Sequence, residues 1–578
     1  MKKNKYIMPS LAVIQTIISC IFFTSIFQYN FSYNIISVIF LILYYKIDKS
    51  TVRQLENKRR TIIIYIISIL FSLSIFIGAT LSYGRGFTNI FYILGVIIVS
   101  ILNSPIFVWI FNKLFSFIEK NEKQEENNKI TKKEVLLIFG IIIVLWIPVL
   151  LAYYPGIFDY DVHTQLNYVI NNDYSTHHPL IHTLILGFFY KVGGAFGNYN
   201  LGMLFYTITQ MIFVVAIMTY AVVYLRKKGI SRKISYVVVA FYAIFPLNSI
   251  LTISITKDIY FSAFVLAFVV CLMKIRDDNW RFSKNYIIFA IITIFMILFR
   301  SNAIYALIIS LVIMMFLGIK KHKNILIAIL ISIILATSVE TVLEKLLDAY
   351  TKNEKDMLSI PLQQLARVGN ECKDQLTEEE YKEISYYVSP EYYNEYLSDP
   401  IKNHTDISKI RNDYKEFISI WFKYFIKYPT VYLESFLYNT QGYWDINDIS
   451  HSQIYGINKE SRTGYLLTGT KEGYNVEHIS YCKPIESLYE YLFTENKYQN
   501  IPVISLLFAP AIYIWIYIIC LAYNIYRKKT ESIIVLTFFA GLFITLLVGP
   551  TCLIRYVYPF VICVPVIISD VFIDRNRK

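Results

Sequence analysis

Long apolar runs separated by short polar stretches make up most of this 578-residue chain. A helix that crosses a membrane needs about 20 mostly apolar residues. Segments close to that length occur at residues 9–28, 31–47, 61–82, 88–112, 135–153, 200–225, 234–251, 257–274, 285–300, 304–319, 324–341, 502–526, 533–548 and 556–573. This pattern predicts an all-α polytopic membrane protein with about 14 transmembrane helices.

The basic residues of the short connections predict how these helices are oriented. If the N-terminus is inside, one side of the membrane holds all the basic connections, at 46–60, 112–134, 226–233, 274–284, 320–323, 527–529 and 574–578. Lys and Arg are enriched in cytoplasmic loops. We therefore expect a multi-pass protein of the cell (plasma) membrane, with both termini cytoplasmic and residues 341–501 extracytoplasmic.

One apolar stretch leaves two interpretations open. Residues 179–192 are apolar but short for a crossing, and a crossing there would place the basic residues 226–228 outside. We therefore expect an interfacial or re-entrant helix on the outer face. A fifteenth span is the alternative.

A single long polar region interrupts the apolar pattern. Residues 341–500 carry 17 Lys and Arg and 25 Asp and Glu, a net charge of −8, whereas the rest of the chain carries +21. Helices are expected at 378–388 and 409–427, and Pro429 suits the first turn of a third helix that ends near residue 441.

The chain is therefore expected to have four parts. They are an N-terminal four-span extension (1–134), a membrane core (135–340) with a first outer loop (154–199), an extracytoplasmic helical domain (341–501) and a C-terminal three-span segment (502–578).

Composition and charge exclude an ordinary cytosolic enzyme and also disordered, collagen-like and disulfide-scaffold chains. Apolar and aromatic residues make up 56% of the chain and charged residues 17%, whereas soluble domains carry about 25% charged residues. The net charge of +13 does not indicate nucleic-acid binding, because the basic residues fall between apolar runs. The seven cysteines form no CxxC motif. Cys372 and Cys482 share the polar region, so a disulfide between them is one possibility and two free thiols are the other.

The first outer loop contains residues suited to chemistry. Asp159 and Asp161 follow a Pro-Gly turn at the end of a predicted span. Two carboxylates spaced i and i+2 face the same side of an extended chain. They could bind a divalent cation, Mg²⁺ or Mn²⁺, or divide into a base and an orienting group. Solvated surface charge is the simpler interpretation of such a short motif.

Histidines gather in the same loop. Four of the eight in the chain lie within twenty positions, at His163, His177, His178 and His182. His178 and His182 share one face of a helix that starts at Pro179. We expect His177, His178 and His182 to contact substrate, because no HExxH-type metal motif accompanies them.

Further charged residues occur where other predicted spans reach the outer face. They are Lys257 and Asp258 at one span, Arg300 at a second and Arg555 at a third. Asp258 has a simple role as a helix cap, and the arginines as snorkelling side chains. Several cations and carboxylates on one face nevertheless suit an anionic or phosphate-bearing substrate.

These motifs resemble an uncharacterised bacterial family of multi-pass proteins. The resemblance covers roughly residues 135–570 of this chain. It is strongest in the stretches YPGIFDYDVHTQ, THHPLIHTLILG, SITKDIYFS, FRSNAIY, SIPLQQLARV and YPTVYLESFLYNTQGYW. That family is placed beside the protein-mannosyltransferase-like and Rgt-type members of the GT-C superfamily. The resemblance implies a GT-C-like core that moves a sugar from a polyprenyl-phosphate donor to a cell-envelope glycan, lipid or protein acceptor.

The same resemblance implies roles for individual residues. Asp159 or Asp161 would deprotonate the acceptor or bind a metal, and Asp258 would be the acidic residue of the second outer loop. The donor phosphate would be held by three cations, Lys257, Arg300 and Arg555. Three other classes remain open: a flippase or transporter of cell-envelope lipids, a polysaccharide polymerase, and a structural or sensory membrane protein.

Overall fold

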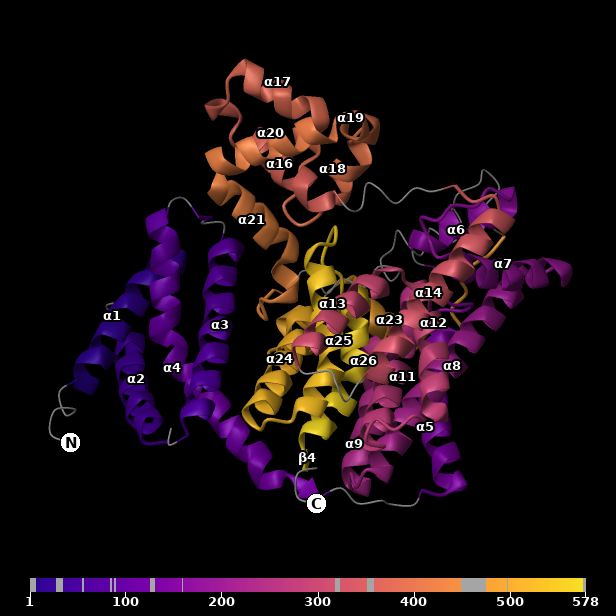
Figure 1. Ribbon diagram of the computed structural model, residues 1–578, viewed down its shortest axis with the longest axis horizontal. Coiled ribbons are helices and arrows are strands. Elements are labelled where there is room, and N and C mark those ends of the chain that lie inside the picture. Colours follow the sequence, from indigo (N-terminus) through magenta and orange to yellow (C-terminus); the bar gives the residue numbers. More distant parts are fainter. Residues whose placement is uncertain are drawn as a thin grey trace.

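The computed structural model describes residues 7–27, 35–54, 57–83, 86–87, 90–124, 130–158, 160–317, 323–350, 358–448, 475–495 and 497–574. These residues are almost entirely helical, and their strands are four two-residue segments. Apolar helices form a broad bundle, and a small helical lobe stands on one end of it (Figure 1). The architecture is that of a polytopic membrane protein, as the apolar pattern predicts.

The described residues contain fewer full-length crossings than the apolar pattern predicts. Among the described residues, nine helices are long and apolar enough to cross a membrane, and a pair bent by 51° would make a tenth. Four other predicted spans correspond to shorter apolar helices, at Ile35–Ile47, Lys284–Phe299, Asn302–Phe316 and Pro510–Tyr526. At about 1.5 Å per residue these fall short of a hydrocarbon core about 30 Å thick. The number fourteen therefore stays a prediction.

The N-terminal part is a four-helix unit at the left of Figure 1. Its helices are α1 (Ile7–Phe27), α2 (Ile35–Gln54), α3 (Lys58–Ser82) and α4 (Ile90–Asn121). Glu434 of the lobe accepts a hydrogen bond from the backbone N–H of Phe87 and pairs with Arg367. The connection between α3 and α4 is thereby attached to the lobe.

The remaining bundle is built around two deeply buried helices. Its first half contains α5 (Lys132–Ala152), α6 (Tyr160–Asn171), α7 (Leu180–Ala195), α8 (Tyr199–Lys227), α9 (Arg232–Ile244), α10 (Pro246–Thr252), α11 (Lys257–Asp277), α12 (Lys284–Phe299), α13 (Asn302–Phe316) and α14 (Lys323–Leu346). Its second half contains α24 (Pro510–Tyr526), α25 (Thr530–Leu547) and α26 (Ile554–Val571). Helices α11 and α26 are the most buried of the candidate spans.

The connection from α5 to α8, which contains α6 and α7, starts and finishes at one end of the bundle. Glu134 in the first turn of α5 pairs with Arg232, 2.7 Å away, and approaches Arg226 in the last turn of α8 at 4.0 Å. Helices α5 and α8 are therefore antiparallel, so the chain between them returns to the end where it started. This geometry favours the interfacial or re-entrant interpretation of residues 179–192 over a fifteenth span.

Two short parallel bridges tie distant parts of the chain together. Strand β2 (Ile157–Phe158) pairs with β3 (Ser254–Ile255) at the end of the bundle below the lobe, here called the cavity end. Strand β1 (Lys123–Gln124) pairs with β4 (Ile573–Asp574) at the opposite end. At that opposite end the fully buried Arg276 binds both carboxylate oxygens of Asp570, at 2.8 and 2.9 Å.

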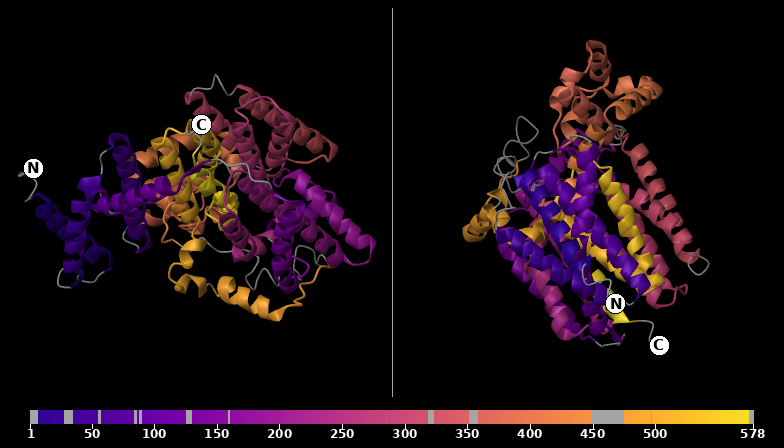
Figure 2. Two further views of the ribbon diagram at one scale, coloured as in Figure 1. Left: turned by 90° about the horizontal axis from the view of Figure 1, so that it is seen from below. Right: turned by 90° about the vertical axis from the view of Figure 1, so that its left-hand side faces the viewer.

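The lobe has a core of its own. It comprises α16 (Ser359–Glu371), α17 (Glu378–Tyr387), α18 (Asp399–His404), α19 (Ile407–Asn412), α20 (Tyr414–Lys427) and α21 (Pro429–Thr440), with 3-10 helices η4 (Lys373–Gln375), η5 (Pro390–Tyr392) and η6 (Gln441–Tyr443). Its buried side chains run from Leu362 to Tyr432. Figure 2 shows the lobe projecting from the bundle.

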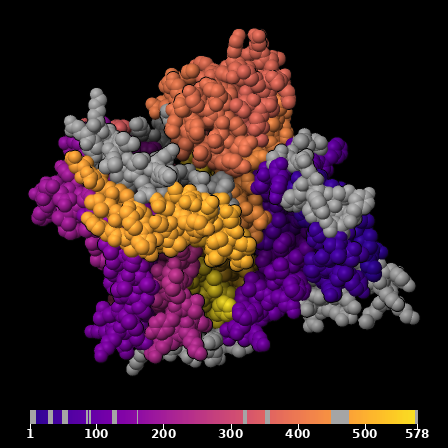
Figure 3. All heavy atoms as spheres, turned by 180° about the vertical axis from the view of Figure 1, so that it is seen from behind, coloured from indigo at the N-terminus to yellow at the C-terminus, as the bar shows by residue number. Residues whose placement is uncertain are grey.

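The described residues of the predicted domain at 341–501 pack in more than one place. Helix α14 continues to Leu346, and residues 475–508, here called the strap, pack on the bundle through aromatic side chains such as Tyr489 and Phe493. The strap consists of α23 (Lys483–Tyr489), η8 (Glu490–Thr494), η9 (Lys497–Asn500) and η10 (Ser505–Phe508), and it crosses the outside of the bundle (Figure 3). Much of the predicted loop at 442–473 lies outside the described residues.

Two finer expectations differ from the structure, and one alternative that was left open is decided by it. The predicted span at 502–526 is helical in α24 only from Pro510, because proline fits the first turn and not the interior of a helix. The predicted helix at 409–427 is interrupted at Asp413, whose carboxylate caps α20. Cys372 and Cys482 are free thiols, since one is buried in the lobe and the other lies beside the bundle.

Candidate functional site

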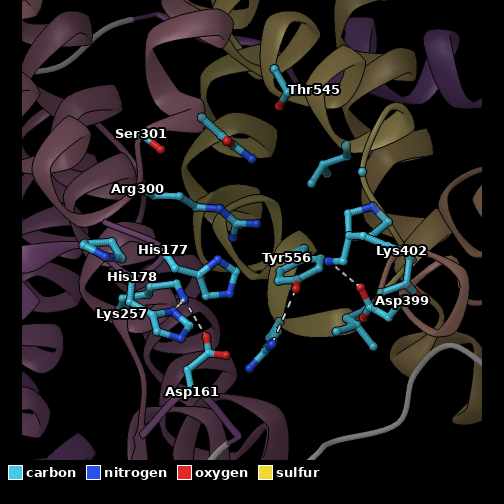
Figure 4. Close-up of a pocket in the computed structure, with 18 of the residues that line it drawn as sticks. Asp161, His177, His178, Lys257, Arg300, Ser301, Asp399, Lys402, Thr545 and Tyr556 are labelled. Atoms are coloured by element: carbon cyan, nitrogen blue, oxygen red, sulfur yellow. Dashed lines mark hydrogen bonds and ion pairs between the residues drawn. The ribbon is translucent and has the colours of Figure 1, made fainter. Parts of the chain in front are cut away.

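A cavity of about 620 Å³ lies between the cavity end of the bundle and the lobe. Four cationic side chains and two carboxylates line it, together with two histidines and several tyrosines (Figure 4). Six of the nine residues singled out in the sequence are among them, at Asp161, His177, His178, Lys257, Arg300 and Arg555. They come from four separate stretches of the chain.

Local structure explains why Asp161 meets Lys257. The β2–β3 bridge places the start of α6 beside the start of α11, since each strand runs into its helix within a few residues. Lys257 then reaches across the bridge, with its Nζ 2.5 Å from Asp161 Oδ2 and 3.1 Å from His178 Nδ1. Figure 4 shows these three side chains together on one wall of the cavity.

Asp258 lies beneath the cavity as the shared partner of two arginines. Its side chain is 1% exposed, and its Oδ1 accepts a hydrogen bond from Arg300 Nη1 at 2.7 Å. Its Oδ2 lies 3.7 Å from Arg555 Nε. The aromatic ring of Tyr556 has the guanidinium groups of Arg300 and Arg555 4.5 and 5.2 Å from its centre. Asp258 is thus a buried counter-ion that holds both arginines.

The lobe contributes a second charged wall that the sequence reasoning missed. Asp399 and Lys402 in α18 pair at 2.7 Å, and both line the cavity on the side opposite Lys257 and His178 (Figure 4). Tyr443 of η6 also lines it. A charged pair spaced i and i+3 in a polar helix is ordinary, so no sequence signal distinguished these residues.

The charges of the first wall fix two protonation states. Burial raises the pKa of Asp161, but Lys257, Arg555 and His178 outweigh it and hold that pKa well below its usual range. Burial and the neighbouring Lys257 keep the pKa of His178 well below its usual value. Asp161 is therefore ionised and His178 neutral near pH 7. Because Lys257 donates to Nδ1 of His178, its proton is on Nε2, and the imidazole is a donor toward other ligands.

The remaining predicted residues lie elsewhere. His182 is fully buried, with Nδ1 3.0 Å from Gln165 Oε1 and Nε2 2.7 Å from the Tyr206 hydroxyl. It links α7 to α6 and α8. Both ring nitrogens are engaged in the core, so its expected contact with substrate gains no support from this geometry. His163, the fourth histidine of the loop and not one of the nine, does not line the cavity, and burial lowers its pKa to about 4. Asp159 lies outside the described residues.

The described residues do not form a metal centre. No group of three or more His, Cys, Asp or Glu side chains placed to hold a metal ion occurs among them. The ammonium group of Lys257 lies 2.5 Å from Asp161 Oδ2, so this oxygen already faces a cation. A Mg²⁺ or Mn²⁺ site at Asp159 and Asp161 therefore gains no support from the surroundings of Asp161.

Comparisons with known proteins give one result. A family model described as a family of unknown function (DUF6020) matches residues 173–578, which is more than two thirds of the chain. The matched region contains every cavity residue named above except Asp161. The chain matches no curated protein and no solved structure.

Proposed function

The chain belongs to the DUF6020 family, and we propose that it is a GT-C-type glycosyltransferase of the cell membrane. It would move a sugar from a polyprenyl-phosphate donor to a cell-envelope acceptor on the outer face. One observation supports this above all: cations and carboxylates from separate elements converge on one cavity at the end of apolar helices. Such a place is accessible both to a lipid-borne phosphate and to a polar acceptor.

The balance of charges suggests where a phosphate would bind within the cavity. Lys257 is paired with Asp161 and Lys402 with Asp399. Arg300 and Arg555 both lie against the carboxylate of Asp258. Among the described residues, four cations thus meet three carboxylates in and beneath the cavity, which leaves a net positive charge there. We assign the phosphate to the two arginines, because planar guanidinium groups suit phosphate oxygens. The Nε2–H of His178 supplies a further donor near them.

The reaction is a single displacement at the anomeric carbon. The acceptor oxygen forms a bond to that carbon, its proton passes to the Asp161 carboxylate, and the bond to the donor phosphate breaks. The phosphate leaves with the bonding electrons, and Arg300 and Arg555 stabilise its added negative charge. The cations of the chain itself would lie near the leaving group, and a divalent cation at Asp161 stays a prediction.

The test compares Asp161→Asn with Asp173→Asn, an exposed control in the same outer connection. Cells expressing each variant are analysed for cell-envelope glycans, and purified protein is tested for binding of inorganic phosphate. Loss of a general base lowers rates by about 10²- to 10⁴-fold. Asp161→Asn should therefore abolish glycan transfer but still bind phosphate, and the control should behave as wild type.

Two outcomes would contradict the proposal. Normal transfer by Asp161→Asn, at normal expression, would exclude this carboxylate as the base. Transport of a lipid-linked sugar across proteoliposomes without any transfer would assign the protein to the flippases instead.

A further inference from the structure

We propose that Asp399 and Lys402 of the lobe form a subsite for neighbouring hydroxyl groups of a sugar ring. This inference rests on the proposed function, since it names what binds beside the phosphate. Both side chains line the cavity and face it from the lobe, across from the wall that carries His178 and Lys257 (Figure 4).

The charge of this pair favours a neutral ligand over an anion. Lys402 Nζ lies 2.7 Å from Asp399 Oδ1, so its positive charge is balanced within α18. Arg300 and Arg555 carry the guanidinium groups to which the proposed function assigns the phosphate. A second anionic group would have to compete with Asp399 for Lys402. A hydroxyl group carries no charge, so Asp399 does not repel it and it need not displace that carboxylate from Lys402.

The chemistry of the pair matches hydroxyl recognition. A carboxylate only accepts hydrogen bonds and an ammonium group only donates them, whereas a hydroxyl group does both. Adjacent hydroxyls on a ring can thus donate to Asp399 and accept from Lys402. The Lys402 side chain is 11% exposed and that of Asp399 44%, so the cavity shields the first and leaves the second open to a ligand.

The lobe is attached to the bundle at the very start of α18. Both the backbone N–H and the hydroxyl of Ser398 donate to the carbonyl of Pro550, at 3.1 and 2.7 Å. Leu397 pairs with Thr551 in an antiparallel bridge. Asp399 follows directly after these contacts, and Arg555 lies a few residues beyond Thr551. The subsite and the phosphate site are therefore held in one fixed relation.

The experiment measures binding by purified full-length protein in detergent. Inorganic phosphate, glucose 1-phosphate, galactose 1-phosphate, mannose 1-phosphate and their deoxy analogues serve as probes. Wild type should bind one sugar phosphate at least about tenfold more tightly than phosphate, since hydrogen bonds to charged groups contribute that much. Asp399→Asn and Lys402→Gln should lose this preference and keep the affinity for phosphate.

A second arm identifies the source of the hydroxyls. Methyl glycosides are titrated in the presence of saturating phosphate. If they bind in an Asp399-dependent manner and sugar phosphates bind no better than phosphate, the subsite holds the acceptor. If sugar phosphates show the preference, it holds the sugar of the donor. Either result supports the subsite.

Lys423→Gln is the matched control, because Lys423 pairs with Glu383 on the same lobe and does not line the cavity. It should leave all affinities unchanged. Equal binding of every probe by wild type and Asp399→Asn, with phosphate binding intact, would overturn the subsite but not the proposed function. No binding of phosphate or of any sugar phosphate by wild type would overturn both. Melting temperatures show whether each variant is folded.

Discussion

Replacing Asp258 by Asn tests the electrostatic argument directly, because two consequences have opposite signs. The carboxylate is buried beneath two arginines and has no contact with the cavity itself. Its neutralisation should destabilise the fold and at the same time strengthen the binding of phosphate. A residue that merely shaped the site would weaken both.

The two magnitudes can be worked from the structure. Breaking a buried ion pair costs about 3–5 kcal/mol, and Asn should lie at the lower limit because it still accepts a hydrogen bond from Arg300. A phosphate oxygen on Arg300 would lie about 5.5 Å from Asp258, through the 2.7 Å contact and a further contact of ~2.8 Å. At an effective dielectric constant of ~20 the repulsion removed is about 3 kcal/mol. This is an upper bound on the gain, near 100-fold in affinity, since the arginines can relax.

The assay combines a melting curve with a phosphate titration on protein purified in detergent. Asp570→Asn is the matched control, because Asp570 is also a buried carboxylate bound by an arginine, at the end of the bundle away from the cavity. Both variants should melt at lower temperature. Only Asp258→Asn should bind phosphate more tightly than wild type, with an affinity at least about tenfold higher, which is within the upper bound given by the removed repulsion.

One result would refute this reasoning. If Asp258→Asn bound phosphate more weakly than wild type while Asp570→Asn bound it normally, Asp258 would act by positioning the arginines. The excess positive charge would then not explain where an anion binds.

Three further outcomes follow from the structure. Folding lowers the pKa of His178, so below about pH 6.5 the unfolded chain takes up a proton that the folded chain does not. The melting temperature of the wild type should therefore fall between pH 7 and pH 5, and that of His178→Asn should fall less. Gly78→Ala should cost about 1–3 kcal/mol, because its Cβ would lie 2.0 Å from a carboxylate oxygen of Asp445. Gly95→Ala, with nothing within 4 Å of the added carbon, should leave the melting temperature unchanged or slightly higher. Cys372 is buried and its pKa is raised, so a maleimide should label it only after denaturation, as mass spectrometry can show; labelling of the native protein would contradict the packing of the lobe.

The bundle wall of the cavity can be predicted from the sequence, because its charged residues follow a simple rule. Charged side chains are costly at membrane depth, so those at the ends of apolar runs are conspicuous. Lys257, Arg300 and Arg555 stood out for this reason, and alternation of the spans placed them on one face. The structure brings all three to one cavity.

The sequence does not predict the wall that the lobe contributes, nor does it tell which histidines line the cavity and which lie in the core. Asp399 and Lys402 belong to a polar lobe where charge is unremarkable, and their position depends on contacts between Ser398 and Pro550, which are far apart in the sequence. His182 resembles a ligand-binding residue only by its neighbours in the chain. Its partners Gln165 and Tyr206 come from other helices, and no local pattern reports them.

The short β2–β3 bridge has a consequence for how a ligand would bind. Its four residues are almost fully buried, and Gln210 Nε2 donates to the carbonyls of both Thr252 and Ser254 at 2.7 Å. The backbone next to Asp161 and Lys257 is therefore already ordered, and it would lose little conformational freedom when a ligand binds. A ligand would meet a preorganised wall, and the entropic cost of ordering would be confined to its own atoms and to the side chains that touch it.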